Sequence, residues 1–158
     1  MILLYEPHLA LIFVLGTCNY MSPEVVRNRK VKPPAKRTLY GNKCDIWGLG
    51  VILFELIFDV NPFDFPCELN DCKDKDRGTP LCPECMDTSY AAILDGDVDV
   101  GESFASQAPP GSLDLLGHVM KMDPAQRYSA EDVLGHVFVK DCVGCRRGCG
   151  GFKTCGFV

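Results

Sequence analysis

Four cysteines in the middle of the chain have the type and spacing of a metal site. They form two pairs, Cys67-x4-Cys72 and Cys82-x2-Cys85, on either side of a polar loop of mixed charge. Zinc binds four thiolates in a tetrahedron, and because four protein ligands leave no position for water, such an ion would be structural. Disulfides and free thiols are the alternatives. We find no export signal in the sequence and a cytosol keeps thiols reduced, which argues against disulfides; spacing alone leaves zinc and free thiols open.

A second group of cysteines lies in the glycine-rich tail, residues 141–158. One interpretation is a second zinc site, which the arginines beside the thiols would support. The abundant glycines favour the other interpretation, a poorly ordered extension. The cysteines concerned are Cys142, Cys145, Cys149 and Cys155.

The element that must hold such a site in place is the apolar segment KCDIWGLGVILFELIFDVNPF, residues 43–63. A surface helix shows only an apolar stripe, whereas this segment is apolar nearly all round. We therefore predict a helix over about 43–58, buried at the centre of a domain. It is too short to span a membrane, and Asp45 and Glu55 lie inside it. A buried carboxylate at Asp45 would need fixed donors and would organise nearby backbone; the alternative is an ordinary core helix with an N-terminal acid.

Capping residues and prolines place the elements before this helix. Ser22 is predicted to cap a short helix whose first position is Pro23. A basic loop is expected at residues 27–42, because Pro33 and Pro34 forbid a helix there. The first fifteen residues are mostly apolar, and either a strand or a helix fits them.

The part of the chain after the cysteines is also expected to be helical. Ser129, with Asp132 three residues later, predicts the cap of a last helix that runs to Val139. A helix is expected at residues 88–95 and an acidic loop at residues 96–111. A further helix is expected at residues 112–120, where Ser112 begins a weak capping pattern.

Three segments occur in an order that resembles the C-terminal half of a protein kinase catalytic domain. They are GTCNYMSPEVV (residues 16–26), the apolar helix, and MDPAQRYSAEDVLGHVFV (residues 122–139). The resemblance implies a mainly α fold, a protein-kinase large-lobe segment at residues 16–140, flanked by the N-terminal segment 1–15 and the tail 141–158. The ordered set is more specific than any single segment.

The cysteine-rich insertion, residues 66–86, points to one subfamily among the protein kinases. The four cysteines surround Asp76-Arg77-Gly78, and the second pair reads Cys-Pro-x-Cys. This arrangement resembles the MAP-kinase-interacting kinases of the calmodulin-kinase-like group, although the first cysteine pair is one residue wider than expected. The resemblance implies a zinc-binding loop insertion within the large lobe.

The resemblance also implies roles for individual residues. In the family, the glutamate at the position of Glu24 forms a buried ion pair with the arginine at the position of Arg127; two solvated charges would be the alternative. Thr17 matches the threonine that serine/threonine kinases place beside the catalytic base. Asp45 and Trp47 belong to the same structural, substrate-side motif.

The catalytic parts of a kinase are not found in this sequence. We find no glycine-rich loop, phosphate-binding lysine, catalytic-loop aspartate and asparagine, or Asp-Phe-Gly motif. The chain alone is therefore predicted to be inactive, with ATP and magnesium bound only in a full-length parent that phosphorylates protein serine or threonine. The alternative is a non-catalytic, zinc-stapled interaction protein; a secreted disulfide protein would need an export signal.

Composition limits the partners. The 158 residues suffice for one domain with a real core, and 47% of them are apolar. A net charge of -5 argues against nucleic acid and anionic membranes as partners. By resemblance, the expected partners are a protein substrate, such as the cap-binding translation initiation factor, and an upstream MAP kinase. The expected location is the cytoplasm and also the nucleus.

Overall fold

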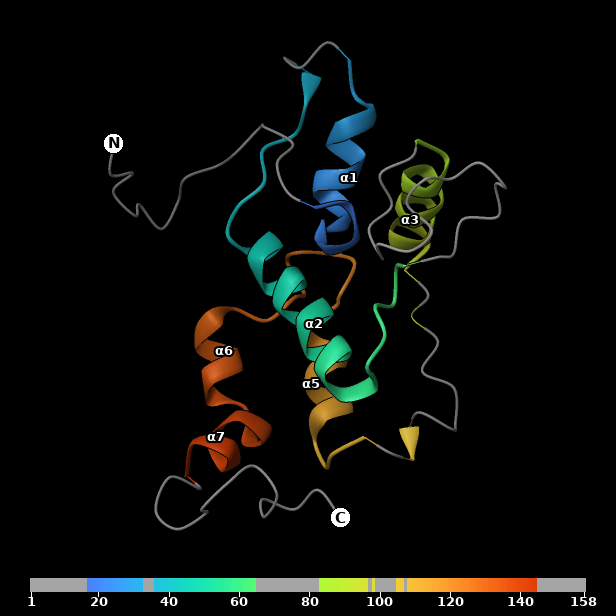
Figure 1. Cartoon of the computed structure of the whole chain (residues 1–158). Helices are drawn as coiled ribbons and strands as arrows, with labels where there is room; N and C mark the ends of the chain where they lie inside the picture. The colour runs from blue at the N-terminus through green and yellow to red at the C-terminus, as the bar shows by residue number, and fades with distance from the viewer. Residues whose placement is uncertain are drawn as a thin grey trace, which may run out of the picture.

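The computed structural model describes residues 17–32, 36–64, 83–96, 98, 105–106 and 108–144, with only the backbone given for 83–85 and 141–144. This part of the chain is mostly helical (Figure 1). Its elements are η1 (Cys18–Tyr20), α1 (Pro23–Lys30), α2 (Lys43–Phe58), α3 (Pro83–Asp95), α5 (Ser112–Val119), α6 (Ala130–Gly135) and α7 (Val137–Gly144). None of its helices is long and apolar enough to cross a membrane.

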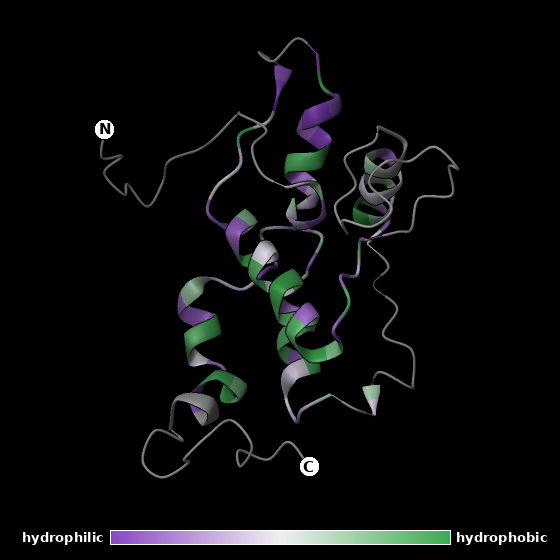
Figure 2. Ribbon diagram, viewed as in Figure 1, coloured by the Kyte–Doolittle hydropathy of each residue, from purple (hydrophilic) through white to green (hydrophobic). Residues whose placement is uncertain are grey.

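Helix α2 lies at the centre of the described structure, as its composition predicts (Figure 1). It packs against α5 and η1, while α3 packs against α1 and η1. Figure 2 shows that α2 is hydrophobic along most of its length, whereas the end of α1 is hydrophilic. The predicted bounds of α2 are confirmed. The helix ends where Asp59 takes a left-handed conformation and its amide bonds to the Glu55 carbonyl.

Three groups of buried side chains meet along α2. Near its start, Trp47 and Val51 join a cluster with side chains of η1, α1 and α3. Near its end, Phe54 and Phe58 pack against Leu116 of α5. A third group joins α5 to α6 through Leu115, Val119 and Val133. The helix therefore connects the N-terminal and C-terminal halves of the lobe segment.

One expectation for α2 is wrong: the helix is not buried all round. Leu49, Ile52 and Leu56 are 42%, 46% and 79% exposed, and their spacing places them on one face. The described residues cover this face only in part. Hydropathy tells how apolar a helix is, but the partner that covers each face comes from elsewhere in the chain or from another molecule.

Two helices begin or end away from the predicted positions. Helix α1 continues to Lys30, into the expected loop, because the prolines disfavour helix only from the residue before Pro33. Helix α3 begins at Pro83, five residues earlier than predicted. Proline is favoured at the first helical position, where its missing N–H costs nothing, so this start was readable in the sequence.

The predicted last helix is interrupted at His136. The cap is as predicted: Ser129 accepts a hydrogen bond from the Asp132 amide, and Asp132 accepts one from the Ser129 amide. However, α6 ends at Gly135, and His136 takes an extended conformation before α7 begins. The His136 Nε2 atom lies 2.8 Å from the Asp114 carboxylate of α5. This contact between helices explains the break, and local sequence does not reveal it.

Helix α5 is also capped differently from the prediction. Its cap is Gly111, whose φ of 81° suits glycine, rather than a side chain of the predicted pattern. Ser112 instead donates a hydrogen bond to the Pro109 carbonyl at 2.6 Å, which stabilises the turn that leads into the helix.

The close approach of α2 and α5 gives a first prediction. A β-carbon added at Gly50 would lie 2.6 Å from Met120 Cγ and 2.9 Å from Val119 Cγ2. We expect Gly50→Ala to destabilise the protein by about 1–3 kcal/mol, because overpacking outweighs the gain in helix propensity. Urea denaturation monitored by circular dichroism would measure the change.

The matched control is Gly117→Ala in α5, where an added β-carbon meets nothing within 4 Å. This change should be neutral or stabilise by up to about 1 kcal/mol, as alanine does in an open helical position. Equal stability of the two variants would contradict close packing of α2 on α5.

Candidate functional site: a buried arginine network beside an open groove

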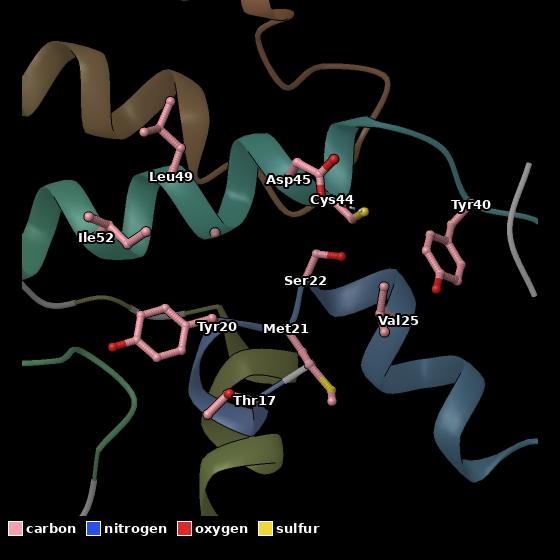
Figure 3. Close-up of a pocket in the computed structure, with 11 residues that line it drawn as sticks. Thr17, Tyr20, Met21, Ser22, Val25, Tyr40, Cys44, Asp45, Leu49 and Ile52 are labelled. Atoms are coloured by element: carbon pink, nitrogen blue, oxygen red, sulfur yellow. Dashed lines mark hydrogen bonds between the residues drawn. The ribbon is translucent and has the colours of Figure 1, made fainter. Parts of the chain in front are cut away.

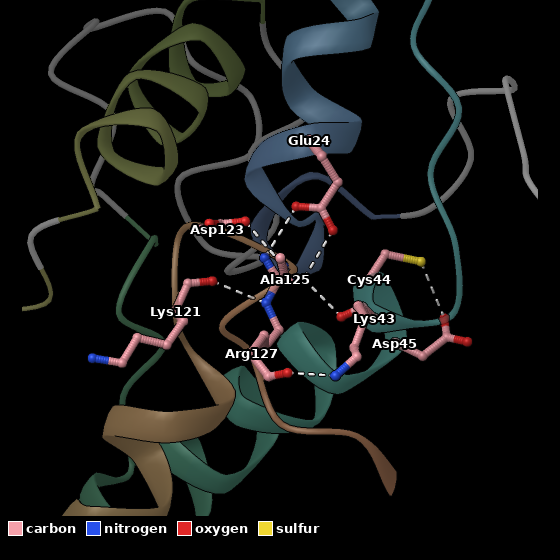
Figure 4. A network of polar contacts seen from close by, with 8 residues as sticks. All are labelled: Glu24, Lys43, Cys44, Asp45, Lys121, Asp123, Ala125 and Arg127. Carbon is pink, nitrogen blue, oxygen red and sulfur yellow. Dashed lines mark hydrogen bonds and ion pairs between the residues drawn. The ribbon is translucent and has the colours of Figure 1, made fainter.

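The centre of the candidate site is the buried side chain of Arg127. This residue belongs to the segment that connects α5 to α6. Figure 4 shows it surrounded by acceptors from segments that are distant in the sequence. Nη1 and Nη2 donate to the two carboxylate oxygens of Glu24 at 2.8 and 3.0 Å. Nη1 also donates to the Lys43 carbonyl at 2.7 Å, and Nε donates to the Lys121 carbonyl at 2.9 Å.

The ion pair predicted between Glu24 and Arg127 is therefore confirmed. The Arg127 side chain is 0% exposed and that of Glu24 is 12% exposed, so the alternative of two solvated charges is wrong. The paired geometry is bidentate, which fits the planar guanidinium to the carboxylate. Helix α1 positions Glu24 in its first turn, next to Pro23 at the helix start.

The pKa of Glu24 reflects two opposing influences. Burial alone would raise the pKa of this carboxyl, but the hydrogen bonds and positive charge of Arg127 outweigh it and hold the pKa below its ordinary value. The carboxylate is thus ionised at neutral pH and engaged with the guanidinium. A group held in this state is suited to structure rather than to proton transfer.

Trp47 forms the apolar side of the same network. Its ring lies 5.2 Å from the Arg127 Cζ atom and 5.8 Å from the Phe63 ring, stacked on the latter at 15°. Asn61 fixes the turn that brings Phe63 into place, because its Oδ1 accepts a hydrogen bond from the Phe63 amide. The tryptophan near the start of α2 therefore contacts both an arginine and an aromatic ring.

An open groove of about 470 Å³ lies next to this network. Figure 3 shows α2 on one side of it and the η1–α1 segment on the other. Thr17 is exposed at the groove, at the N-terminal edge of η1. The groove lining is mainly apolar: Thr17, Tyr20, Met21, Ser22, Val25, Tyr40, Cys44, Asp45, Gly48, Leu49 and Ile52.

Asp45 lines this groove as an exposed residue, so the expectation of a buried carboxylate that organises nearby backbone is wrong. The Asp45 carboxylate contacts the neighbouring Cys44 thiol, whose sulfur lies 3.6 Å from Oδ1. Burial, together with the nearby Asp45 charge, raises the pKa of Cys44 to about 11. This thiol is therefore protonated at neutral pH and is a poor nucleophile.

The predicted zinc ligands fall largely outside the described residues. Cys67, Cys72 and Cys82 lie outside them, and only the backbone of Cys85 is described, in the first turn of α3. The tail cysteines beyond residue 144 also lie outside. Within the described part of the chain, no group of three metal-ligating side chains comes together. The zinc site remains a sequence prediction.

Sequence reasoning missed several residues that hold the site. The Lys43 and Lys121 carbonyls accept from Arg127, and backbone acceptors leave no trace in residue type. Asn28 accepts a hydrogen bond from the Thr38 amide and donates one to its carbonyl, which fastens the return of the chain toward α2. Glu55 accepts from the Tyr20 hydroxyl at 2.9 Å, which fixes one wall of the groove.

The buried pair generates a prediction about stability and pH. Arg127→Met should destabilise the fold by about 3–5 kcal/mol at pH 7, because it leaves the Glu24 carboxylate buried without its partner. Since the folded pKa of Glu24 is lowered, the pair stabilises fully above the ordinary value of 4.5 and loses this effect as pH falls through the folded pKa. The difference between wild type and variant should therefore shrink in acid, as measured by urea denaturation from pH 7 to 3.

Arg27→Met is the matched control, since Arg27 is an exposed arginine of α1. It should change stability by no more than about 0.5 kcal/mol and show no such pH dependence. Similar losses in the two variants would contradict a special role for the buried pair.

Comparisons with known proteins agree with this architecture. The protein kinase domain family matches residues 5–139. The match begins eleven residues before residue 16, where the sequence motifs of the kinase-like segment begin. A MAP kinase-interacting serine/threonine-protein kinase of Caenorhabditis elegans, mnk-1, is 34% identical over 83% of this chain and 17% of its own length. MAP kinase-interacting serine/threonine-protein kinase 2 of Xenopus laevis is 33% identical over 79% of the chain and 25% of its own length.

A plant relative extends the range of similarity. Calcium-dependent protein kinase 34 of Arabidopsis thaliana is 28% identical over 87% of this chain and 21% of its own length. The chain thus spans about a quarter or less of the length of these relatives. With the family matched over most of its residues and the Glu24–Arg127 pair in place, the chain belongs to the protein kinase family.

Proposed function

We propose that the chain is the substrate-side portion of the large lobe of a serine/threonine kinase similar to the MAP-kinase-interacting kinases. In a longer parent protein, this lobe would position a protein substrate while ATP donates its γ-phosphate to a serine or threonine. The observation that carries the proposal is the bidentate Glu24–Arg127 pair, which joins two of the three kinase-like segments around the start of α2. The names of the relatives support the choice of subfamily.

The proposal assigns no ATP chemistry to the chain alone. No phosphate- or magnesium-binding motif is found in the sequence. The groups of the candidate site are a structural ion pair, an exposed acid and a protonated thiol, and these are not the groups with which kinases bind a nucleoside triphosphate. The proposed partners are a protein substrate and a MAP kinase, the latter because the relatives are named for interacting with MAP kinases.

A second candidate function is a non-catalytic interaction protein built on a kinase lobe. The observation that favours it is the exposed apolar face of α2, with Leu49, Ile52 and Leu56 open to solvent. Large exposed apolar patches mark interaction surfaces in soluble proteins. The two candidates differ in whether the lobe supports phosphate transfer once the missing parts are supplied.

The first test is phosphate transfer by the chain itself. The purified 158-residue chain should incorporate no phosphate from radiolabelled ATP into a serine-containing peptide, because it lacks the groups that bind ATP and magnesium. Incorporation that an ATP-site inhibitor blocks would contradict this expectation.

The lobe proposal itself is tested with a chimera. The part of the Caenorhabditis elegans relative that precedes the matched region would be fused to residues 5–144 of this chain, so that the whole matched region is kept. The chimera should phosphorylate the peptide, and its Arg127→Met form should be less active, with the unmodified relative as the positive control. A folded chimera that binds ATP but transfers no phosphate would favour the non-catalytic interaction protein.

Structural zinc is part of the same proposal. We expect about one zinc ion per chain in protein purified under reducing conditions, bound by Cys67, Cys72, Cys82 and Cys85. The reducing cytoplasm and nucleus, the proposed locations, would keep these thiols available. Cys82→Ser or Cys85→Ser should release the metal, as measured by inductively coupled plasma mass spectrometry, and make the insertion protease-sensitive while helicity persists.

Cys44→Ser is the matched control, because Cys44 lies in α2 beside the groove. Its zinc content should equal that of the wild type. Replacing the tail cysteines together should also leave the zinc bound. A preparation without zinc, or loss of zinc only on changing the tail, would overturn the assignment of the ligands.

A further inference from the structure

The end of α1 and the segment that follows it concentrate positive charge. Residues 25–44 hold seven of the chain's 16 lysines and arginines and none of its 21 aspartates and glutamates. The whole chain has a net charge of -5, so without these seven positive charges the remaining residues carry -12. A local excess of this size, opposite in sign to the rest of the chain, indicates a surface for a charged partner.

The exposed cations of this stretch form what we call the basic surface. In the described part of the chain, no carboxylate forms an ion pair with any of them. Like charges on neighbouring positions repel one another, and a bound anion would relieve this repulsion. Figure 2 shows the hydrophilic end of α1, which contributes the first three members. The basic surface consists of Arg27, Arg29, Lys30, Lys32 and Lys36.

Helix stability accounts for only part of this charge. Arg27, Arg29 and Lys30 lie in the last turn of α1, where cations interact favourably with the helix dipole. Lys32 and Lys36 lie beyond the end of the helix, and the influence of the dipole is confined to its last turn. The continuation of the positive charge past α1 therefore needs another explanation.

The fold holds the two ends of the basic surface together. The buried Asn28 side chain donates to the Thr38 carbonyl at 2.7 Å and accepts from the Thr38 amide at 3.0 Å. Arg27 and Arg29 flank Asn28 in the sequence. Lys36 lies two residues before Thr38. The contact thus brings cations from before and after the intervening segment to one part of the molecule.

The side chain of Arg29 is also oriented by a neighbouring helix. Its Cζ atom lies 4.6 Å from the centroid of the Tyr90 ring, and Tyr90 is a buried residue of α3. A cation over an aromatic face is attracted by the ring, which restricts the side chain before any partner arrives. A surface ordered in advance loses less conformational entropy on binding.

We propose that the basic surface binds an acidic segment of another protein, a run of aspartate or glutamate side chains. Lysine and arginine bind carboxylates through charge-assisted hydrogen bonds, and the arginine fork can engage both oxygens of one carboxylate. The interaction goes beyond the proposed kinase function, because it requires neither ATP nor phosphate transfer.

The charge of the remaining residues favours a short acidic peptide over a nucleic acid or a membrane. At physiological ionic strength, charges more than about 8 Å apart in solvent are largely screened from one another. A peptide that lies along the basic surface is therefore attracted to it and little affected by the net charge of -12 elsewhere. A longer polyanion or an anionic bilayer would extend over the acidic remainder of the chain and be repelled.

Fluorescence anisotropy with a labelled octaglutamate peptide tests the proposal in the full chain. Binding should be measurable at low ionic strength and weaken as salt is added, because salt screens exposed charges. Lys30→Gln combined with Lys32→Gln should weaken binding about tenfold, since each exposed charge pair contributes modestly. The matched control, Lys121→Gln combined with Lys140→Gln, removes the same charge from exposed lysines elsewhere and should change affinity less than about twofold.

A further variant separates the basic surface from the stability of α1. Lys36→Gln alters the surface outside this helix and should weaken binding about threefold, with the circular dichroism spectrum and urea midpoint of the wild type. Equal losses in the two double variants would overturn the proposal, because net charge alone would then explain the binding. Absence of peptide binding, or tighter binding of a single-stranded oligonucleotide or of phosphatidylserine vesicles under the same conditions, would overturn it as well.

Discussion

The buried guanidinium of Arg127 sets a condition that the surrounding structure has to meet. A charge without exposure to water is tolerated only when its donors are satisfied and its charge is balanced. Glu24 supplies the balance, and carbonyls at Lys43 and Lys121 accept further hydrogen bonds. These acceptors belong to the start of α1, the start of α2 and the turn after α5. Satisfying one side chain therefore fixes the relative positions of three segments.

The same residue also links polar and apolar parts of the core. The Trp47 ring packs against the guanidinium and also against the Phe63 ring. A cation beside an aromatic face is attracted by the ring, so the contact adds to the ion pair instead of competing with it. The first turn of α2 is held in this way from two directions, while its opposite face stays open to the groove. One face of α2 is therefore packed and another is exposed, because the two faces meet different neighbours.

How far the sequence predicts this structure depends on where the determining contacts lie. The bounds of α2 and the capping box of Ser129 and Asp132 follow from local composition and short spacing, and both were predictable. The Glu24–Arg127 pair followed from a family resemblance, since the partners are 103 residues apart. The break at His136 and the exposure of Asp45 were not predictable, because they depend on the Asp114 contact and on which segments cover α2.

The clamp formed by Asn28 and Thr38 has a consequence for how this region can change in evolution. The Asn28 side chain pairs with the Thr38 backbone much as a neighbouring strand would, and Asn28 is itself almost fully buried. This contact holds the two ends of the intervening segment together, whatever the length of that segment. Doubling such a loop costs only about 0.6 kcal/mol in closure entropy. Insertions and new recognition sequences can accumulate there without disturbing α1 or α2, which makes this loop a natural site for divergence among related lobes.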